Sequence, residues 1–214
     1  MGKKKHKRLF NLIAPMYGLF FGFQKKRYKE ILAEIQPALD VQDFASAVDF
    51  GCGTGAMASA LAEKGLRVIG IDQAEKMLKV ARKKTKGEGI EYLRADILEP
   101  LPFPDDAFDI AFSSYVAHGF APAARKKMYE EMCRLAKRYV IIHDYNNKRS
   151  FPISIAEWLE GGDYFRFRKK AKTEMEDLMK ELETCFSGVQ VLPVGKHANW
   201  YICKARERKH ERKA

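Results

Sequence analysis

The sequence predicts an α/β fold, in which a mostly parallel, doubly wound sheet is covered by helices on both faces. Strand-like and helix-like patterns alternate from about residue 45 to residue 203, an order typical of strands joined by crossover helices. The chain has 214 residues, of which 46% are hydrophobic. This is enough for one domain with a substantial core.

The first strand is a short apolar run that ends in a glycine-rich loop. Residues 48–55 read Val-Asp-Phe-Gly-Cys-Gly-Thr-Gly, and a helix-forming run follows at residues 56–64. Glycine permits positive φ and lets the backbone approach a ligand closely, which is typical of nucleotide-cofactor sites. The glycines also fit the loose dinucleotide pattern G-x-G-x-x-G/A. However, the carboxylate of Asp49 would repel a pyrophosphate, whereas it suits a ligand with an amine or sulfonium charge.

Acids also end the next two predicted strands. Residues 67–72 form an apolar strand that ends at Asp72, about twenty residues after the glycines, where a carboxylate would accept hydrogen bonds from a ribose diol. Residues 90–97 form the third strand, which carries Asp96 near its end. The run at residues 101–110 then leads into the fourth strand.

The following elements complete the alternation. Pro122 is placed to start a helix, and its apolar stripe is Met128, Met132 and Leu135. The fifth strand is predicted at residues 139–143. We expect the methionine stripe to face the core.

The last part of the chain predicts one more helix and a closing hairpin. Thr173 and Glu176 form a capping box before an amphipathic helix. Two strands near residues 189–194 and 199–204 are joined by a short turn. The second of them would close the sheet.

Taken in order, four motifs resemble those of class I S-adenosylmethionine-dependent methyltransferases of the small-molecule type that act on quinone and sterol precursors. They are D-x-G-x-G-x-G from Asp49, the acids Asp72 and Asp96, and the run at residues 101–110. The resemblance implies a Rossmann-like, mostly parallel sheet of seven strands with an antiparallel last strand. It also implies methyl transfer from S-adenosylmethionine to a small, partly apolar acceptor, which yields S-adenosylhomocysteine.

The resemblance assigns cofactor contacts residue by residue. Asp49 and the glycine loop would bind the methionine part, Asp72 the ribose hydroxyls, and Asp96 with Ile97 the adenine. An A-P-x-Y segment at residues 14–17 resembles the family's N-terminal cover, although Gly18 stands where Asp is common. The cofactor-binding residues expected are Tyr17, Asp49, Gly51, Cys52, Gly53, Gly55, Asp72, Gln73, Met77, Asp96, Ile97 and Ser113.

The acceptor is expected beside the ends of the fourth and fifth strands. A histidine there could take a proton from a hydroxyl, an amine or an acidic carbon, and in-line methyl transfer needs no metal. Residues 113–116 read Ser-Ser-Tyr-Val rather than N-P-P-Y, which makes methylation of nucleic-acid bases less favoured. The candidate catalytic residues are His118, His143 and Asp144. The candidate substrate-binding residues are Tyr115, His118, Tyr145, Trp158, Tyr164 and Phe165.

We expect three regions along the chain. Residues 1–36 would be a basic tail followed by cover helices, residues 37–204 the methyltransferase domain, and residues 205–214 a second basic tail. Within the domain, residues 146–172 would form an insertion that lies over the strand ends as a substrate lid.

The positive charge is concentrated at the ends of the chain. The net charge is +11; residues 1–8 carry five Lys or Arg and no acid, and residues 204–214 carry six against two acids. Basic ends of this kind are usually solvated tails. The alternative is that they bind RNA or an anionic membrane surface. Methylation of RNA recruited by these tails is therefore one alternative, and a non-catalytic cofactor-binding protein is another.

The sequence also indicates a compartment. Cys52, Cys133, Cys185 and Cys203 show neither a pairing pattern nor zinc-ligand spacing, which favours a reducing cytoplasm and no structural metal. Residues 9–23 are apolar but too short to span a bilayer, and they lack a cleavage site. We expect no transmembrane segment, and the sequence leaves the oligomeric state open.

Overall fold

The computed structural model describes residues 3–146, 180 and 186–205. Its strands are β1 (Ser46–Phe50), β2 (Arg67–Asp72), β3 (Glu91–Arg94), β4 (Phe108–Ser114), β5 (Ala136–Tyr145), β6 (Phe186–Val194) and β7 (Ala198–Ala205). The helices are α1 (Lys3–Ile35), α2 (Ala56–Ala62), α3 (Glu75–Lys84) and α4 (Pro122–Leu135), with short 3-10 turns η1 (Val41–Asp43) and η2 (Ala117–Gly119).

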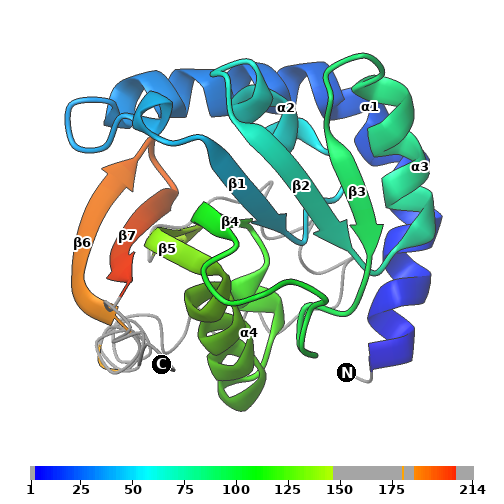
Figure 1. Ribbon diagram of the computed structural model, residues 1–214. Coiled ribbons are helices and arrows are strands. Elements are labelled where there is room, and N and C mark those ends of the chain that lie inside the picture. Colours follow the sequence, from blue (N-terminus) through cyan, green and yellow to red (C-terminus); the bar gives the residue numbers. More distant parts are fainter. Residues whose placement is uncertain (1–2, 147–179, 181–185, 206–214) are drawn as a thin grey trace.

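The strands form one seven-stranded sheet in the order β3-β2-β1-β4-β5-β7-β6 (Figure 1). Strands β1 to β5 pair in parallel, whereas β7 lies between β5 and β6 and runs antiparallel to both. The predicted α/β sheet with an antiparallel last strand is confirmed.

Two hydrophobic cores lie on opposite faces of this sheet. On one face, α1 and α2 pack on residues such as Phe112 and Trp200. On the other face, α4 packs on residues such as Phe50 and Val140, and its predicted stripe of Met128, Met132 and Leu135 is fully buried. Figure 1 shows α4 on its own face, apart from α1, α2 and α3.

Two strands end at residues other than those expected, so some candidate site residues lie in a different element from the one predicted. Strand β3 ends at Arg94, so Asp96 lies in the loop beyond it. Strand β5 continues past the expected end at His143, because its pairing with β7 extends to Tyr145 and Ala198. Asp144 and Tyr145 therefore lie within β5 rather than after it.

The N-terminal segment is one helix instead of a tail followed by several cover helices. Helix α1 has 33 residues and includes Pro15. Proline removes one helical hydrogen bond, yet the helix continues through it, and the neighbouring Ala14 and Tyr17 pack against the start of α3. Within the described ranges, no helix combines the length and hydropathy that crossing a membrane requires.

Several expectations fall outside the described residues. These are the substrate candidates Trp158, Tyr164 and Phe165, the lid at residues 146–172 apart from Asn146, the capped helix from Thr173, and the C-terminal tail beyond residue 205. They stay predictions.

Candidate functional site

The glycine loop joins β1 to α2 at the carboxyl end of the sheet. Gly51, Gly53 and Gly55 have φ values of +69°, +52° and +81°, a region that side chains other than glycine rarely adopt. A Cβ atom at Gly51 would lie 2.6 Å from Cγ2 of Val116, whereas a Cβ atom at Gly53 would have nothing within 4 Å. The loop therefore packs against the protein at Gly51, whereas at Gly53 it borders open space.

Asp72 holds this loop against the end of β2. One carboxylate oxygen accepts a hydrogen bond from the Gly53 amide (3.0 Å) and the other from the Ala74 amide (2.7 Å). Burial raises the pKa of Asp72, and these amides offset part of that rise. Each carboxylate oxygen has a second lone pair, so the side chain can still accept hydrogen bonds from ligand hydroxyls.

Asp49 is a buried carboxylate inside β1. It is 1% exposed, and within the described part of the chain its Oδ2 atom has no hydrogen-bond partner. Burial, with a smaller contribution from the nearby charge of Asp72, raises the pKa of Asp49 to about 8. A cationic group beside it would favour the ionised form.

The alternation of side chains divides the candidate residues between the two faces of the sheet. Ser114, His143 and Trp200 are register partners on β4, β5 and β7. They share the α1 and α2 face with Asp49, because side chains two positions apart point the same way. Asp144, one position on, faces the α4 side.

On the α4 side, Asp144 pairs with His118 of η2. The Nδ1 atom of His118 lies 2.8 Å from Oδ1 of Asp144, and the His118 amide donates to Oδ2 at 3.0 Å. Both residues are at most 5% exposed. Although burial would raise it, the pKa of Asp144 is lowered by the charge and the hydrogen bonds of His118. The pair fixes the orientation of the His118 ring.

On the opposite side, His143 lies among aromatic rings. Its ring centroid is 4.5 Å from that of Tyr115 and 5.9 Å from those of Tyr28 and Trp200. The side chain is 1% exposed, and neither ring nitrogen has a hydrogen-bond partner among the described residues. Burial lowers the pKa of His143 to about 4. His143 is therefore neutral at neutral pH, where it can donate one hydrogen bond and accept another.

Acidification is expected to destabilise the protein through His143. Unfolded histidine binds a proton below pH about 6.5, whereas folded His143 does so only below about 4. Between these values the unfolded state binds more protons, so stability falls as the pH falls, by up to about 3 kcal/mol. Urea unfolding at neutral pH and at pH about 4.5 should show a smaller acid loss in His143→Gln than in the wild type. His197→Gln, in the turn between β6 and β7, should keep the wild-type loss. An unchanged loss in His143→Gln would contradict this account.

Tyr115 connects the two groups at the strand ends. Its backbone has φ +54°, which is strained for an aromatic residue. Its ring lies 4.5 Å from His143 and 4.7 Å from Tyr145, and Tyr145 in turn lies 4.8 Å from His118. The predicted acceptor-side residues that the structure describes are thus brought together.

The other predicted cofactor residues lie around the same edge. Tyr17 packs with Ala74 and Met77, directly after Asp72 and Gln73. The Asp96 carboxylate accepts from the Leu98 amide, and Ile97 is buried in the α4-side core. Cys52 and Ser113 are buried, the latter beside Phe50 in the sheet.

Three residues at this edge were not predicted from the sequence. Tyr28 of α1 and Trp200 of β7 contact His143, and Tyr92 of β3 lies against Gly55 and Gly70. Tyr28 is spaced three and four positions from Ile31 and Leu32, so helical periodicity could have placed it on the buried face of α1. Nothing local in the sequence indicates the contacts of Trp200.

Known proteins resemble this chain in sequence and in fold. A family model described as a methyltransferase domain matches residues 48–142. A solved structure of a putative S-adenosyl-L-methionine-dependent methyltransferase from Methanococcus maripaludis superimposes with a TM-score of 0.70 at 19% identity, covering 98% of each chain. The chain contains a class I S-adenosylmethionine-dependent methyltransferase domain. The predicted family and cofactor are confirmed.

Relatives of this methyltransferase domain include quinone-type enzymes. An uncharacterized methyltransferase, YcgJ, of Bacillus subtilis is 34% identical over 103 residues, which cover 46% of this chain and 40% of that protein. A demethylmenaquinone methyltransferase of Shouchella clausii is 30% identical over 151 residues, which cover 64% of this chain and 61% of that protein. The chain thus spans less than two thirds of the length of these relatives.

The methyltransferase domain has the features that its cofactor requires. S-Adenosylmethionine carries an ammonium and a sulfonium charge, and the buried Oδ2 atom of Asp49 offers an acceptor that nothing in the described residues occupies. Gly53 leaves open space at the loop where a ligand would approach the backbone. Asp72 retains acceptor capacity for hydroxyls. These residues fit the cofactor.

Proposed function

We propose that the protein transfers the methyl group of S-adenosylmethionine to a small, partly apolar acceptor. The observation that carries the proposal is the cluster of aromatic rings at the ends of β4 and β5, formed by Tyr28, Tyr115, Tyr145 and His143. An aromatic surface with few polar groups suits an apolar acceptor that bears one polar reacting group. The quinone-type relatives agree with an acceptor of this kind.

The cofactor supplies an activated methyl group, so the protein's main tasks are to align the acceptor and to exclude water. We infer that His143, neutral and enclosed, orients a polar group of the acceptor through a hydrogen bond. We infer that His118 takes the acceptor's proton at Nε2, because Asp144 accepts from Nδ1 and so directs basicity to the other nitrogen. Asp144 then stabilises the protonated ring.

The alternatives receive no comparable support. The relatives described above are named as methyltransferases, and none of their names refers to RNA or to a regulatory role. We place the reaction in the cytoplasm, since the spacing of the four cysteines in the sequence shows no disulfide pattern.

The first test is to identify the acceptor by incubating small-molecule extracts with the protein and methyl-labelled S-adenosylmethionine. We expect label in a small, partly apolar product. Label only in RNA, or binding of the cofactor without turnover on any extract, would contradict the proposal.

With the acceptor known, His118→Asn tests the base. Asparagine keeps a nitrogen donor near the place of Nδ1 for Asp144 but removes Nε2, so the fold should survive while kcat falls by roughly 10²- to 10⁴-fold. The pH profile of kcat should lose its acidic limb in His118→Asn and retain it in His143→Gln. A wild-type profile in His118→Asn would show that His118 is structural.

A further inference from the structure

Helix α1 exposes a continuous stripe of large apolar side chains. Leu19 is 83% exposed, and Leu12, Met16, Phe20 and Phe23 are between 51% and 74% exposed. Positions 12, 16, 19, 20 and 23 follow the 3.6-residue period and so share one face of the helix. We call these five residues the outer stripe. Contiguous exposed apolar surface of this kind marks an interaction site.

The outer stripe is not the face by which α1 packs on the rest of the domain. Ala14 is fully buried, and Tyr17 packs with it against Ala74 and Met77 at α3. The inward face alone therefore holds the helix in place. Figure 1 shows the N-terminal half of α1 running beside α3 at one end of the molecule, away from β6 and β7. The side chains of the outer stripe belong to none of the hydrophobic clusters that the described residues form.

Basic residues flank the outer stripe on both sides. From Lys3 to Lys29 the chain carries nine Lys or Arg and no Asp or Glu. Five of them precede Leu12 and four follow Phe23. An apolar helix face between clusters of positive charge is the pattern of helices that lie in the interface of an anionic membrane.

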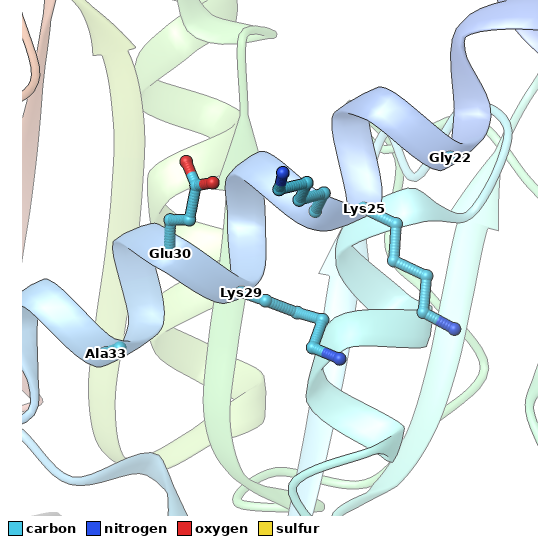
Figure 2. Close-up of a pocket in the computed structure, with 6 residues that line it drawn as sticks. Gly22, Lys25, Lys29, Glu30 and Ala33 are labelled. Atoms are coloured by element: carbon cyan, nitrogen blue, oxygen red, sulfur yellow. The ribbon is translucent and has the colours of Figure 1, made fainter.

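A basic hollow adjoins the C-terminal end of the stripe. Its volume is about 520 Å³, and it is lined by Gly22, Lys25, Lys26, Lys29, Glu30 and Ala33 (Figure 2). Lys25 and Lys29 each form an ion pair with Glu63, at 2.6 and 2.7 Å. Lys26 is exposed and forms no ion pair within the described part of the chain, which leaves its charge available to an external anion.

We propose that α1 docks the protein on an anionic lipid surface, with the outer stripe inserted among the acyl chains and the flanking Lys and Arg at the headgroups. A second copy of this chain suits the stripe less, because pairing two such helices would bring two basic N-terminal segments, each with five Lys or Arg before Leu12 and no acid, close to each other. RNA would use the charges but would leave the apolar stripe in water. The inference is independent of the proposed methyl acceptor.

The test is flotation of the full chain with vesicles made of equal amounts of phosphatidylglycerol and phosphatidylcholine, compared with phosphatidylcholine alone. We expect binding to the mixed vesicles, little binding to the neutral ones, and weaker binding as salt is raised. The double variant Leu19→Glu, Phe23→Glu should lower partitioning by at least about tenfold, since it removes two inserted side chains. Val191→Glu, at an apolar side chain of β6 that is 38% exposed, is the matched control and should bind like the wild type.

If the glutamate variant does not fold, Leu19→Ser with Phe23→Ser makes the same prediction without new charge. Three results would overturn the proposal. They are no binding to the mixed vesicles, binding unchanged by the stripe variants, and a dimer in vesicle-free solution that the stripe variants dissociate. Binding of RNA that those variants abolish would also overturn it.

Discussion

Gly53→Val is expected to abolish binding of S-adenosylhomocysteine. The Cβ position at Gly53 points into space that the protein leaves open, so a branched side chain there would occupy the volume in which the cofactor approaches the loop. The φ of +52° adds backbone strain of about 1–2 kcal/mol. Gly51 is a poorer probe, since a side chain there would clash with Val116 and disturb the loop itself.

The matched control is Gly65→Val. Gly65 also has a positive φ, +95°, and no atom within 4 Å of its Cβ position, but it precedes β2 at the opposite end of the sheet from the glycine loop. Both variants should lose stability in thermal unfolding. Calorimetry should then show lost affinity only in Gly53→Val. Equal affinities in the two variants would contradict the assignment of the loop.

Asp72→Ala is expected to weaken cofactor binding by about 2–3 kcal/mol while the fold survives. The substitution removes the acceptors available to the ribose hydroxyls. It also releases the Gly53 amide from its 3.0 Å hydrogen bond, which loosens the loop that we propose binds the rest of the cofactor. Both effects act in the same direction, so the loss should appear in calorimetric titration with S-adenosylhomocysteine.

Asp109→Ala separates cofactor binding from general loss of structure. Asp109 also ties backbone together, since its Oδ2 accepts from the Ala45 and Ser46 amides at 2.9 and 3.0 Å, but it does so before β1 rather than after it. This variant should lose thermal stability and keep wild-type affinity. If Asp72→Ala binds as tightly as the wild type, Asp72 does not contact the cofactor.

Much of the fold could be predicted because its signals are local. Strand ends carry the acid and glycine motifs, and Pro122 begins α4 as expected. The position of β7, antiparallel beside β5, could be expected only from the resemblance to class I methyltransferases. A hairpin between β6 and β7 does not by itself show which of the two strands pairs with β5. The single long helix α1 was not predicted, because its order depends on packing against α3, which the local sequence does not show.

The site was less predictable because its contacts join distant residues. His118 and Asp144 are 26 positions apart, and their 2.8 Å contact depends on the register of β4 and β5. His143 and Asp144 are neighbours in sequence but face opposite sides of β5, so they cannot share one role. Tyr28 reaches His143 from α1, which no motif indicates.

The most direct test of the account is calorimetric titration of the wild type with S-adenosylhomocysteine and with NAD. We expect saturable binding of S-adenosylhomocysteine and no comparable binding of NAD, because a cationic ligand group favours the ionised form of Asp49 and a pyrophosphate opposes it. Binding near neutral pH should release a proton, seen as a dependence of the heat on buffer, since burial raises the pKa of Asp49 to about 8 and the ligand's ammonium lowers it. Tight binding of NAD, or no binding of S-adenosylhomocysteine, would contradict the assignment.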